Sequence, residues 1–412
     1  MKNRRVAVTG MGIKSSIGND LKTYWNSLKN GIHGIRPIEF IDTKDLEVKV
    51  ASYDYDFDPT SYFDKKTVRK TDRFCQLALA ASKDALDGQD LLEVHDPFRV
   101  GVIFSSGIGG IGTVEKEHSK WLEKGPGRVS VFLIPMMISN IAAGMISIDA
   151  GFRGDNMDIT TACTSSTNAI GEAFRKIRDG YLDACVAGGS EAGISGLTIA
   201  GFSNMKALTK ASDPDRASIP FDKQRSGFVI GEGAAALVLE ELEFAKARKA
   251  KIYAEILGYG ATADAYHITS PDPTAKSPAK SISNAIQDAG VTPSDIDYIN
   301  AHGTSTGPND RIETLATKIV FGEHAYNLMM SSTKSMTGHM LGAAGAAEAV
   351  ATILALKFGI VPPTIGYLHK DEECDLDYVT EGAREKPIKY ALSNSLGFGG
   401  HNATICFKKF ED

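Results

Sequence analysis

The sequence has few cysteines and no long uninterrupted hydrophobic run. Its 412 residues include five cysteines, which are widely spaced and form no C-x-x-C pair. An odd number of scattered thiols predicts neither a disulfide framework nor a zinc site, and it is typical of a reducing cytoplasm. The longest apolar stretch, "MLGAAGAAEAVATILALKFGI", is interrupted by Glu348, so no membrane association is predicted.

Positive charge is not in excess either. The chain carries 45 Lys and Arg against 51 Asp and Glu, a net charge of −6. General nucleic-acid binders normally have a basic excess, so no nucleic-acid partner is predicted. The N-terminal "MKNRRVAVTGMGI" has only a brief apolar run, broken by Gly10 and Gly12, which favours a first β-strand over a signal peptide.

Short Val- and Ile-rich runs alternate with amphipathic stretches, which predicts an α/β fold. Two halves, near 1–250 and 251–412, also have similar sequence patterns, which indicates an internal duplication. "RRVAVTGMGIKSSIG" resembles "KIYAEILGYGATADAYH", and "TTACTSSTNAIGEAFRKIRDG" resembles "SSTKSMTGHMLGAAGAAEAVATILALKFG". Like halves packed face to face would bring corresponding loops to one cleft. The loops that carry Cys163, His302 and His339 are therefore expected to converge.

Cys163 lies where a strand-like run gives way to a helical pattern, in "DITTACTSSTNAIGEAFRKI". A thiol at the start of a helix lies among N–H groups without intrahelical partners, at the positive end of the helix dipole. Both effects favour the thiolate, so a lowered pKa is predicted for Cys163. The same N–H groups would bind the oxyanion that forms when a thioester is attacked. A buried structural cysteine is the alternative.

Histidine is scarce, and two of the nine lie in glycine- and hydroxyl-rich loops. His302 is in "NAHGTST" and His339 in "SMTGHMLGAAG". Neutral imidazoles can donate an N–H to an enolate oxygen or relay a proton. Lys334 precedes His339 in the same loop and would tune nearby charge, with a surface lysine as the alternative. Glu348 would be costly as a lone buried charge, so it is expected to pair with a cation or with backbone donors.

Four separated motifs closely resemble those of the β-ketoacyl-acyl-carrier-protein synthases: "TTACTSSTNAIG", "NAHGTST", "SSTKSMTGHMLGAAG" and "NSLGFGGHN". The resemblance runs essentially end to end, and within the family the chain looks like the type II, long-chain elongating enzymes. It implies an α/β thiolase-like fold with two pseudo-symmetric halves in a five-layer αβαβα arrangement. The thiol would lie in 1–250 and both imidazoles in 251–412. A cytoplasmic homodimer is also implied.

The resemblance further implies a reaction. Cys163 would take an acyl group from acyl carrier protein as a thioester, while His302 and His339 would assist malonyl decarboxylation and stabilise the enolate. The carbanion would attack the acyl-cysteine and release a β-ketoacyl chain two carbons longer. Lys334 belongs to the same catalytic group. The amides of Cys163 and Phe398 would form the oxyanion hole, with Phe398 as a gate to the acyl tunnel. This chemistry requires no cofactor and no metal.

Further positions match residues that contact substrate, ion or carrier in the family. The predicted substrate-binding residues are Ile108 and Phe202 in the acyl tunnel, with Ser270, Thr304, Thr306 and Gly399. The cluster that holds a monovalent cation in some relatives matches Asn300, Glu348, Ser393 and Asn394. The acidic carrier would dock on Lys65, Lys66, Arg69, Lys70, Arg128 and Lys206. A solvated helix face is the alternative for these basic residues.

Other functions fit the sequence less well. "GIGGIG" has the spacing of a dinucleotide-binding loop, but no acidic residue follows at the required distance, so no such cofactor is predicted. A degradative thiolase needs a second cysteine near the C-terminal glycine loop, where the chain has "GFGGHN". A non-catalytic partner subunit would lack the nucleophile. A ketosynthase of a polyketide pathway shares every catalytic motif and stays open as an alternative.

Overall fold

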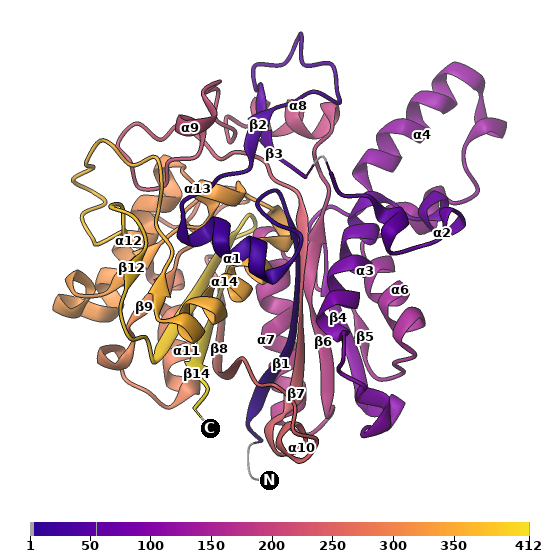
Figure 1. Cartoon of the computed structure of the whole chain (residues 1–412). Coiled ribbons are helices and arrows are strands. Elements are labelled where there is room, and N and C mark those ends of the chain that lie inside the picture. Colours follow the sequence, from indigo (N-terminus) through magenta and orange to yellow (C-terminus); the bar gives the residue numbers. More distant parts are fainter. Residues whose placement is uncertain (1–3, 55, 412) are drawn as a thin grey trace.

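One ten-stranded mixed sheet organises the fold (Figure 1). The computed structural model describes residues 4–54 and 56–411. Across the sheet, the strands follow in the order β10 (Met329–Ser331), β9 (Tyr298–Asn300), β13 (Tyr390–Gly397), β14 (His401–Lys409), β8 (Ala254–Ala263), β1 (Val6–Ser15), β7 (Gly233–Glu241), β6 (Ala184–Glu191), β4 (Val100–Ser105) and β5 (Asn156–Met157).

The sheet consists of two five-stranded halves with equivalent strand orders. The order is β1-β7-β6-β4-β5 in one half and β8-β14-β13-β9-β10 in the other. Each half has two antiparallel pairs followed by two parallel pairs. The halves are joined where β1 pairs with β8 over three residues. The similar sequence patterns of the two halves therefore reflect a repeated topology.

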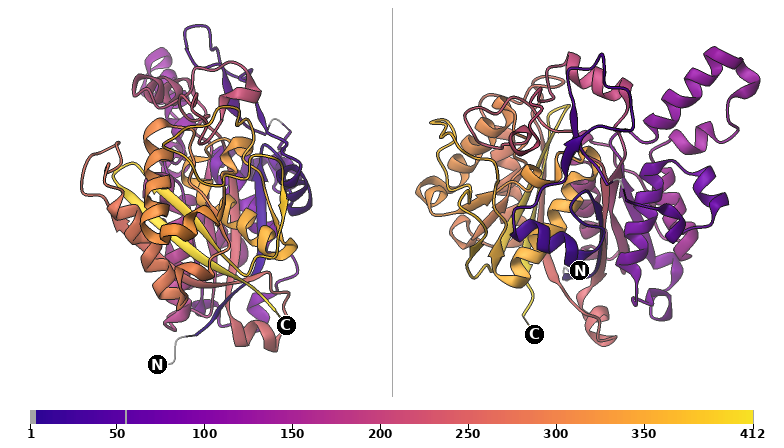
Figure 2. Two further views of the ribbon diagram at one scale, coloured as in Figure 1. Left: turned by 90° about the vertical axis from the view of Figure 1, so that its left-hand side faces the viewer. Right: turned by 45° about the horizontal axis from the view of Figure 1, so that its top comes forward.

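Six long helices complete five layers, which confirms the predicted αβαβα arrangement. Two of them lie between the halves of the sheet, and two cover each outer face (Figures 1 and 2). The central pair is α7 (Ser165–Arg178) and α14 (Ala344–Phe358). The outer pairs are α3 (Arg73–Leu86) with α6 (Ile141–Ala150), and α11 (Lys276–Ala289) with α12 (Gly307–Phe321).

Smaller elements connect these layers. The remaining helices are α1 (Leu21–Lys29), α2 (Lys65–Lys70), α4 (Ile111–Lys124), α5 (Leu133–Met137), α8 (Gly196–Asn204), α9 (Pro214–Ala217), α10 (Leu242–Ala247) and α13 (Lys334–Thr337). Two short hairpins pair β2 (Ile35–Pro37) with β3 (Val50–Ser52), and β11 (Ile360–Val361) with β12 (Arg384–Glu385). The segment that contains α4 and α5 projects from the body of the molecule (Figure 1).

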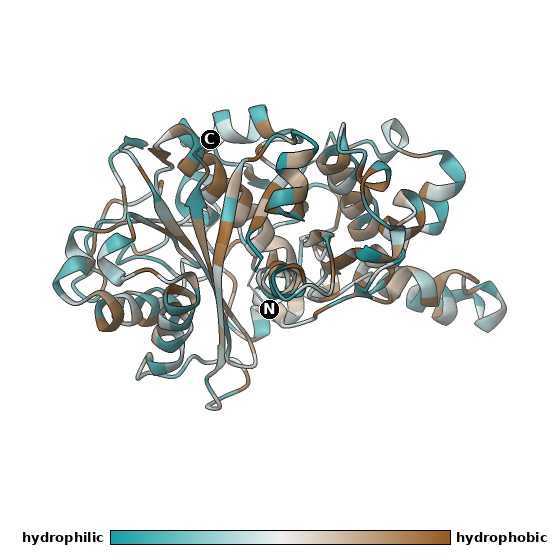
Figure 3. Cartoon of the chain, turned by 90° about the horizontal axis from the view of Figure 1, so that it is seen from below, coloured by the Kyte–Doolittle hydropathy of each residue, from teal (hydrophilic) through white to brown (hydrophobic). Residues whose placement is uncertain are grey.

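Strands β1 and β7 are buried along their whole length because helices cover both faces of the sheet. Figure 3 shows hydrophobic residues on the inner strands and helices and hydrophilic residues on the outlying ones. This burial explains why the central strands read as apolar runs rather than as alternating patterns.

The central helix α14 is packed by both halves of the sheet. Its small residues permit a close approach to α7, since a Cβ added at Gly345 would lie 1.9 Å from Thr167 Oγ1. The segment Leu341–Phe358 is long and apolar enough to cross a membrane by length and composition, and 89% of it is buried inside the protein. It is therefore a core helix.

Truncation of a side chain in α14 should destabilise the whole protein. Ile353 is fully buried, so Ile353→Ala removes packing on both sides and should lower the free energy of unfolding by about 2–5 kcal/mol. Lys357→Ala on the same helix, where the side chain is exposed, should change it by less than about 1 kcal/mol. Urea denaturation of both variants measures the difference, and equal losses would contradict a core role for α14.

Candidate active site

Cys163 lies in a short 3-10 turn, η5 (Ala162–Thr164), that leads directly into α7. Ala162 has a φ of 53°, in the left-handed region that residues with a side chain rarely adopt. Hydroxyl groups hold this strained turn, because Ser165 Oγ accepts the Thr161 N–H and donates to the Ala162 carbonyl. The hydroxyl-rich sequence thus fixes a tight turn that presents the thiol just ahead of the helix.

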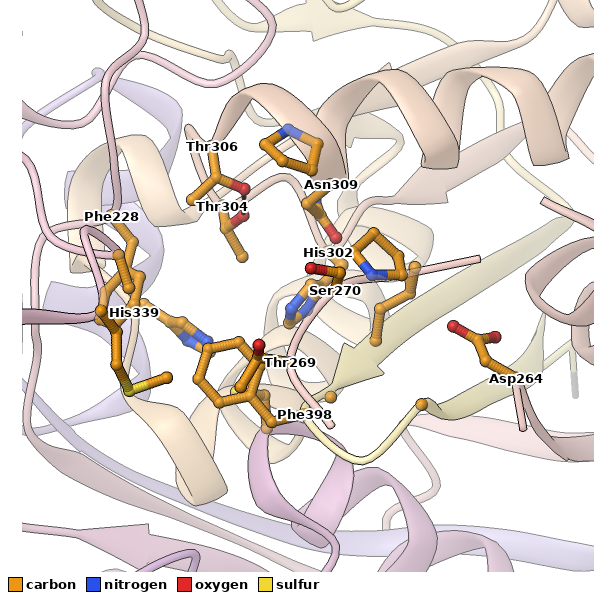
Figure 4. Close-up of a pocket in the computed structure, with 18 of the residues that line it drawn as sticks. Phe228, Asp264, Thr269, Ser270, His302, Thr304, Thr306, Asn309, His339 and Phe398 are labelled. Atoms are coloured by element: carbon orange, nitrogen blue, oxygen red, sulfur yellow. Dashed lines mark hydrogen bonds between the residues drawn. The ribbon is translucent and has the colours of Figure 1, made fainter. Parts of the chain in front are cut away.

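The thiol lines an open cavity of about 220 Å³ with walls from both halves of the chain. Figure 4 shows His302 and His339 facing the space that Ser270, Thr304 and Phe398 surround. The Cys163 sulfur and one ring nitrogen of each histidine all lie within 4.8 Å of one another. The two rings are 5.2 Å apart at 86°. The structure therefore brings together the three groups that the repeated sequence pattern predicts to converge.

Both histidines are neutral because burial lowers their pKa values well below the usual 6.5. The charge of Lys334 lowers them further, and its Nζ lies 3.3 Å from His302 Nδ1. An ammonium can only donate, so Nδ1 accepts and the ring proton of His302 lies on Nε2. One thiol and two imidazoles are also metal-ligand types, but the ammonium at this distance disfavours a second cation there.

Lys334 and Glu348 form a buried ion pair beneath the histidines. Burial raises the pKa of Glu348 to about 7, while the charge of Lys334 opposes this rise. The expectation that Glu348 has a cationic partner is thus met by a lysine of the same half. The surface alternative for Lys334 is wrong, because its side chain is 1% exposed.

The predicted lowering of the Cys163 pKa is wrong for this structure. Burial raises the pKa of the thiol to about 12, although the charge of Lys334 and the N–H of Phe398 oppose this effect. The loss of solvent around the sulfur outweighs both of these opposing influences. The thiol is therefore protonated near neutral pH, and its proton must pass to an acceptor when it reacts.

A glycine-rich hairpin between β13 and β14 closes over the thiol. The Phe398 N–H donates to the Cys163 sulfur. A Cβ at Gly397 would lie 2.9 Å from the Thr161 carbonyl and 3.3 Å from the Cys163 nitrogen, so only glycine permits this approach. Gly399, with a φ of 87°, donates its N–H to the Ile268 carbonyl and does not line the cavity.

The predicted substrate residues separate into two groups. Thr304 and Thr306 line the cavity with their hydroxyls 2.9 Å apart, and Ser270 lines it from a loop of the same half. Ile108 and Phe202 do not line it. The centre of the Phe202 ring lies 6.5 Å from that of the Phe398 ring and 5.4 Å from that of the Phe228 ring. Ile108, which like Phe202 belongs to the first half of the chain, is 36% exposed.

Comparisons with known proteins were made for the whole chain. The family descriptions "Beta-ketoacyl synthase, N-terminal domain" and "Beta-ketoacyl synthase, C-terminal domain" match residues 3–245 and 253–368. The chain belongs to the β-ketoacyl synthase family. It is 48% identical to "3-oxoacyl-[acyl-carrier-protein] synthase 2" of Synechocystis, with all of this chain and 99% of the relative covered. It is 49% identical to the protein of that name in Staphylococcus aureus over the same shares.

Solved structures of ketosynthases share the fold. "The ishigamide ketosynthase/chain length factor" has a TM-score of 0.93 at 34% identity, covering 99% of this chain and 100% of that chain. A β-ketoacyl synthase from Burkholderia phymatum has a TM-score of 0.91 at 34% identity over the same shares. A "type II PKS acyl-carrier protein in complex with its ketosynthase" gives 0.92 at 33% identity, again covering 99% and 100%. These scores confirm the thiolase-like ketosynthase fold.

Three of the four residues that match the family's cation cluster have free oxygens. Asn300 Oδ1, Glu348 Oε2 and Ser393 Oγ are buried without a hydrogen-bond partner among the residues that the structure describes. Asn394 differs, because its Oδ1 accepts from Thr404 and its Nδ2 donates to Glu313. Oxygen ligands of this kind fit a hard cation, so the cluster is suited to a monovalent ion.

The predicted docking residues of this ketosynthase are exposed but lie in three places. Four of them form the exposed surface of α2, where the Lys70 Nζ lies 5.1 Å from the Phe132 ring. Arg128 is exposed beyond α4, in the projecting segment, and Lys206 lines the mouth of the cavity. The neighbouring Arg73 is bound to Glu232 and belongs to the structure of α3.

Sequence reasoning missed two acidic residues of the site. Glu313 of α12 accepts the N–H groups of His302 and Gly303, and burial raises its pKa to about 7. Asp264 accepts from Asn402 Nδ2, and its own N–H donates to the Gly400 carbonyl, which ties the loop after β8 to the glycine-rich hairpin. Both look like ordinary polar residues in the sequence, since their partners are distant along the chain.

Alkylation of Cys163 should report its high pKa. The rate with iodoacetamide should rise about tenfold per pH unit between about pH 7 and about pH 9 without a plateau, because the thiolate fraction grows below the pKa. Lys334→Met removes the charge that opposes the rise and should slow alkylation at least about threefold. Mass spectrometry of the Cys163 peptide measures both rates.

Lys251→Met is the control, because this lysine is exposed and precedes β8, while the cavity-lining Asp264 follows the other end of that strand. Its alkylation rate should equal that of the unchanged protein. A plateau reached below about pH 8 would mean that the thiol ionises near neutral pH and would contradict the protonated resting state.

Proposed function

We propose that this chain catalyses decarboxylative Claisen condensation of malonyl-acyl carrier protein with an acyl chain held on Cys163, extending the chain by two carbons in fatty-acid biosynthesis. The observation that carries the proposal is the cluster of one thiol and two neutral imidazoles, within 4.8 Å of one another in an open cavity. Its relatives at 48–49% identity bear the name 3-oxoacyl-acyl-carrier-protein synthase 2.

In the first step the Cys163 sulfur attacks the carbonyl of the incoming acyl thioester. The new S–C bond forms as the bond to the carrier's thiol breaks, and that thiol takes the proton that Cys163 gives up. Imidazole nitrogens within 4.8 Å can relay this proton. The Phe398 N–H that faces the sulfur and the Cys163 amide are the donors for the carbonyl oxygen when it becomes an oxyanion.

In the second step the malonyl thioester loses carbon dioxide. The bond between its carboxylate carbon and its methylene carbon breaks, and the electron pair of that bond passes into the enolate of the remaining acetyl thioester. Neutral His302 and His339 each have one N–H for the enolate oxygen, and Lys334 keeps that of His302 on Nε2. Thr304 and Thr306 lie in the same wall, where their hydroxyls can hold the amides of the carrier's pantetheine arm.

In the third step the enolate carbon attacks the acyl carbonyl on Cys163. A carbon–carbon bond forms, the tetrahedral intermediate collapses, and the bond to the Cys163 sulfur breaks. The thiolate regains a proton from solvent, which the imidazoles can relay, and the β-ketoacyl product leaves on its carrier. The partly buried position of the sulfur at the base of the cavity limits the access of water to the carbanion.

We infer that the work is divided between the halves predicted at 1–250 and 251–412. The first supplies the thiol, and the second supplies both imidazoles, Lys334 and the Phe398 gate. A monovalent ion held by Asn300, Glu348 and Ser393 would satisfy buried oxygens that have no partner among the described residues. The reaction itself uses only groups of the chain.

We also propose a homodimer in the cytoplasm. Strand β5 is the last strand of the sheet and has only two residues, so one of its edges is unpaired within the chain. Large apolar side chains are exposed nearby on the projecting segment and α6: Val131, Ile134, Ile138 and Ile148. A second copy of the chain would cover an exposed edge and an apolar surface of this kind.

A polyketide ketosynthase is the second candidate, because two solved structures have TM-scores above 0.9, one described as a type II PKS complex and the other as a ketosynthase/chain length factor. Their identity to this chain is 33–34%, against 48–49% for the fatty-acid relatives. The higher identity over equal coverage favours fatty-acid elongation.

A condensation assay tests the proposal directly. The protein should extend acyl-acyl carrier proteins of medium and long chain length when malonyl carrier is supplied. Cys163→Ala should lower condensation at least about a thousandfold and retain malonyl decarboxylation, because the imidazoles remain. Cys406→Ala, which alters a buried thiol outside the cavity, should keep most of the activity. Condensation that survives in Cys163→Ala would refute the role of the thiol.

Docking of an acidic carrier on α2 predicts a charge effect. Lys65→Glu combined with Arg69→Glu should raise KM for carrier-bound substrate at least about fivefold and leave KM for a small pantetheine thioester unchanged. Lys22→Glu on α1, also exposed, is the matched control and should raise neither KM. An equal loss with both substrates would show that α2 does not bind the carrier.

A further inference from the structure

The repeated topology creates a second centre that mirrors the reactive one. Strand β4 is equivalent to β9, so the loop at residues 106–109 mirrors the loop at 302–305 that begins with His302. The backbones agree at the last position of the two loops, since Gly109 and Ser305 have φ values of 69° and 67°.

The turn that carries the thiol has a counterpart as well. Turn η8 (Leu341–Ala343) leads into α14 as η5 leads into α7. Leu341 has a φ of 46°, and Ala162, at the matching place in η5, has 53°. By this equivalence Gly342 stands where Cys163 stands in the reactive centre.

A carboxylate fills this mirror centre. Glu191, the last residue of β6, is fully buried. Its Oε1 accepts from the Ser106 hydroxyl at 2.9 Å and from the Ile108 N–H at 3.2 Å. Its Oε2 accepts from the N–H groups of Gly107 and Gly342, both at 2.9 Å. The amide that corresponds to that of Cys163 is therefore capped by a side chain of the protein.

The mirror centre has no room for a thiol. A Cβ at Gly342 would lie 2.2 Å from the Gly107 nitrogen and 2.8 Å from Glu191 Oε2. One centre is thus open and carries the nucleophile, whereas the other is closed by a carboxylate with four donors around it.

We propose that Glu191 is a positioning residue, whose carboxylate locks the loop after β4 onto turn η8 and thereby fixes His339, three residues before Gly342, for the reaction. This inference rests on the proposed function. All four partners of Glu191 donate hydrogen bonds, so both of its oxygens must accept. A glutamine of the same shape would place an NH₂ group against two of these donors and release the loop or the turn.

The carboxylate also acts on the nucleophile. Burial raises the pKa of Glu191 to about 7, so the carboxylate is ionised above that pH, where its negative charge is one of the influences that raise the pKa of the Cys163 thiol. Removal of this charge should therefore make the thiol more reactive. Displacement of His339 from the place where it can donate to the enolate oxygen should make catalysis slower. The two effects have opposite signs. Partial unfolding could also lower kcat and expose the thiol, so a control variant with an equally buried carboxylate is needed to separate the two causes.

Glu191→Gln tests the inference in the full-length protein. We expect kcat for condensation and the rate of malonyl decarboxylation to fall at least about tenfold, with KM changed less than about twofold. Alkylation of Cys163 by iodoacetamide should become at least about twofold faster at the same pH. Unchanged kcat, or slower alkylation, would overturn the positioning role.

Glu240→Gln is the matched control. Glu240 is equally buried, on the neighbouring strand β7, and its carboxylate is hydrogen-bonded by His95 and Arg248 away from the cavity. This variant should lower the thermal unfolding midpoint but keep kcat per folded molecule and the alkylation rate. An equal loss of kcat in both variants would mean that Glu191 contributes only to stability.

Ser106→Ala carries the test if Glu191→Gln does not fold. It removes one of the four donors to the carboxylate, together with the bond that Ser106 Oγ accepts from the Gly109 N–H. Its kcat should fall about two- to fivefold at unchanged KM. An unchanged kcat would count against the inference. If the unaltered protein does not condense acyl and malonyl groups supplied on carrier protein, the proposed function is wrong. The alkylation rates of the variants still test the action of Glu191 on Cys163 in that case.

Discussion

The buried ammonium of Lys334 is the charge on which the chemistry of the cavity depends. It contacts Glu348 and His302, adds to the effect of burial that keeps both imidazoles neutral, and opposes the effect of burial on the Cys163 thiol. An unpaired ammonium at this depth would be costly, so the carboxylate from α14 is needed to keep it there. A stable ion pair therefore lies directly beneath the reacting groups and sets their protonation.

The duplicated architecture explains how these groups meet. The central helices α7 and α14 begin beside each other at strained turns, and each turn faces loops from the opposite half of the sheet. At one turn the loops bring imidazoles and a glycine-rich hairpin to a thiol. At the other they bring a carboxylate to a glycine, and the space is closed. The two halves thus share a backbone topology but form two different centres. The centre at Cys163 is open and reactive, and the centre at Gly342 is closed and holds the loops together.

Much of this could be predicted from sequence because it is local. The thiol and the histidines lie in short motifs, and the strands are apolar runs that recur in the same order in both halves. The ionisation of Cys163 could not be predicted, since it depends on how far the folded chain shields the sulfur from solvent. Glu313, Asp264 and Glu191 were not predicted either. Their significance comes from N–H groups that only the tertiary fold brings to them.

The protonated sulfur has a consequence for inhibitor design. A simple electrophile that relies on a preformed thiolate will find little of it in this cavity. A better compound would offer a carbonyl oxygen to the Phe398 N–H, and so develop negative charge where the chain already has a donor. Uncharged scaffolds are favoured as well, because the imidazoles are neutral and the nearby ammonium is already neutralised by its carboxylate. Selectivity would then come from shape and donor geometry rather than from electrostatic attraction.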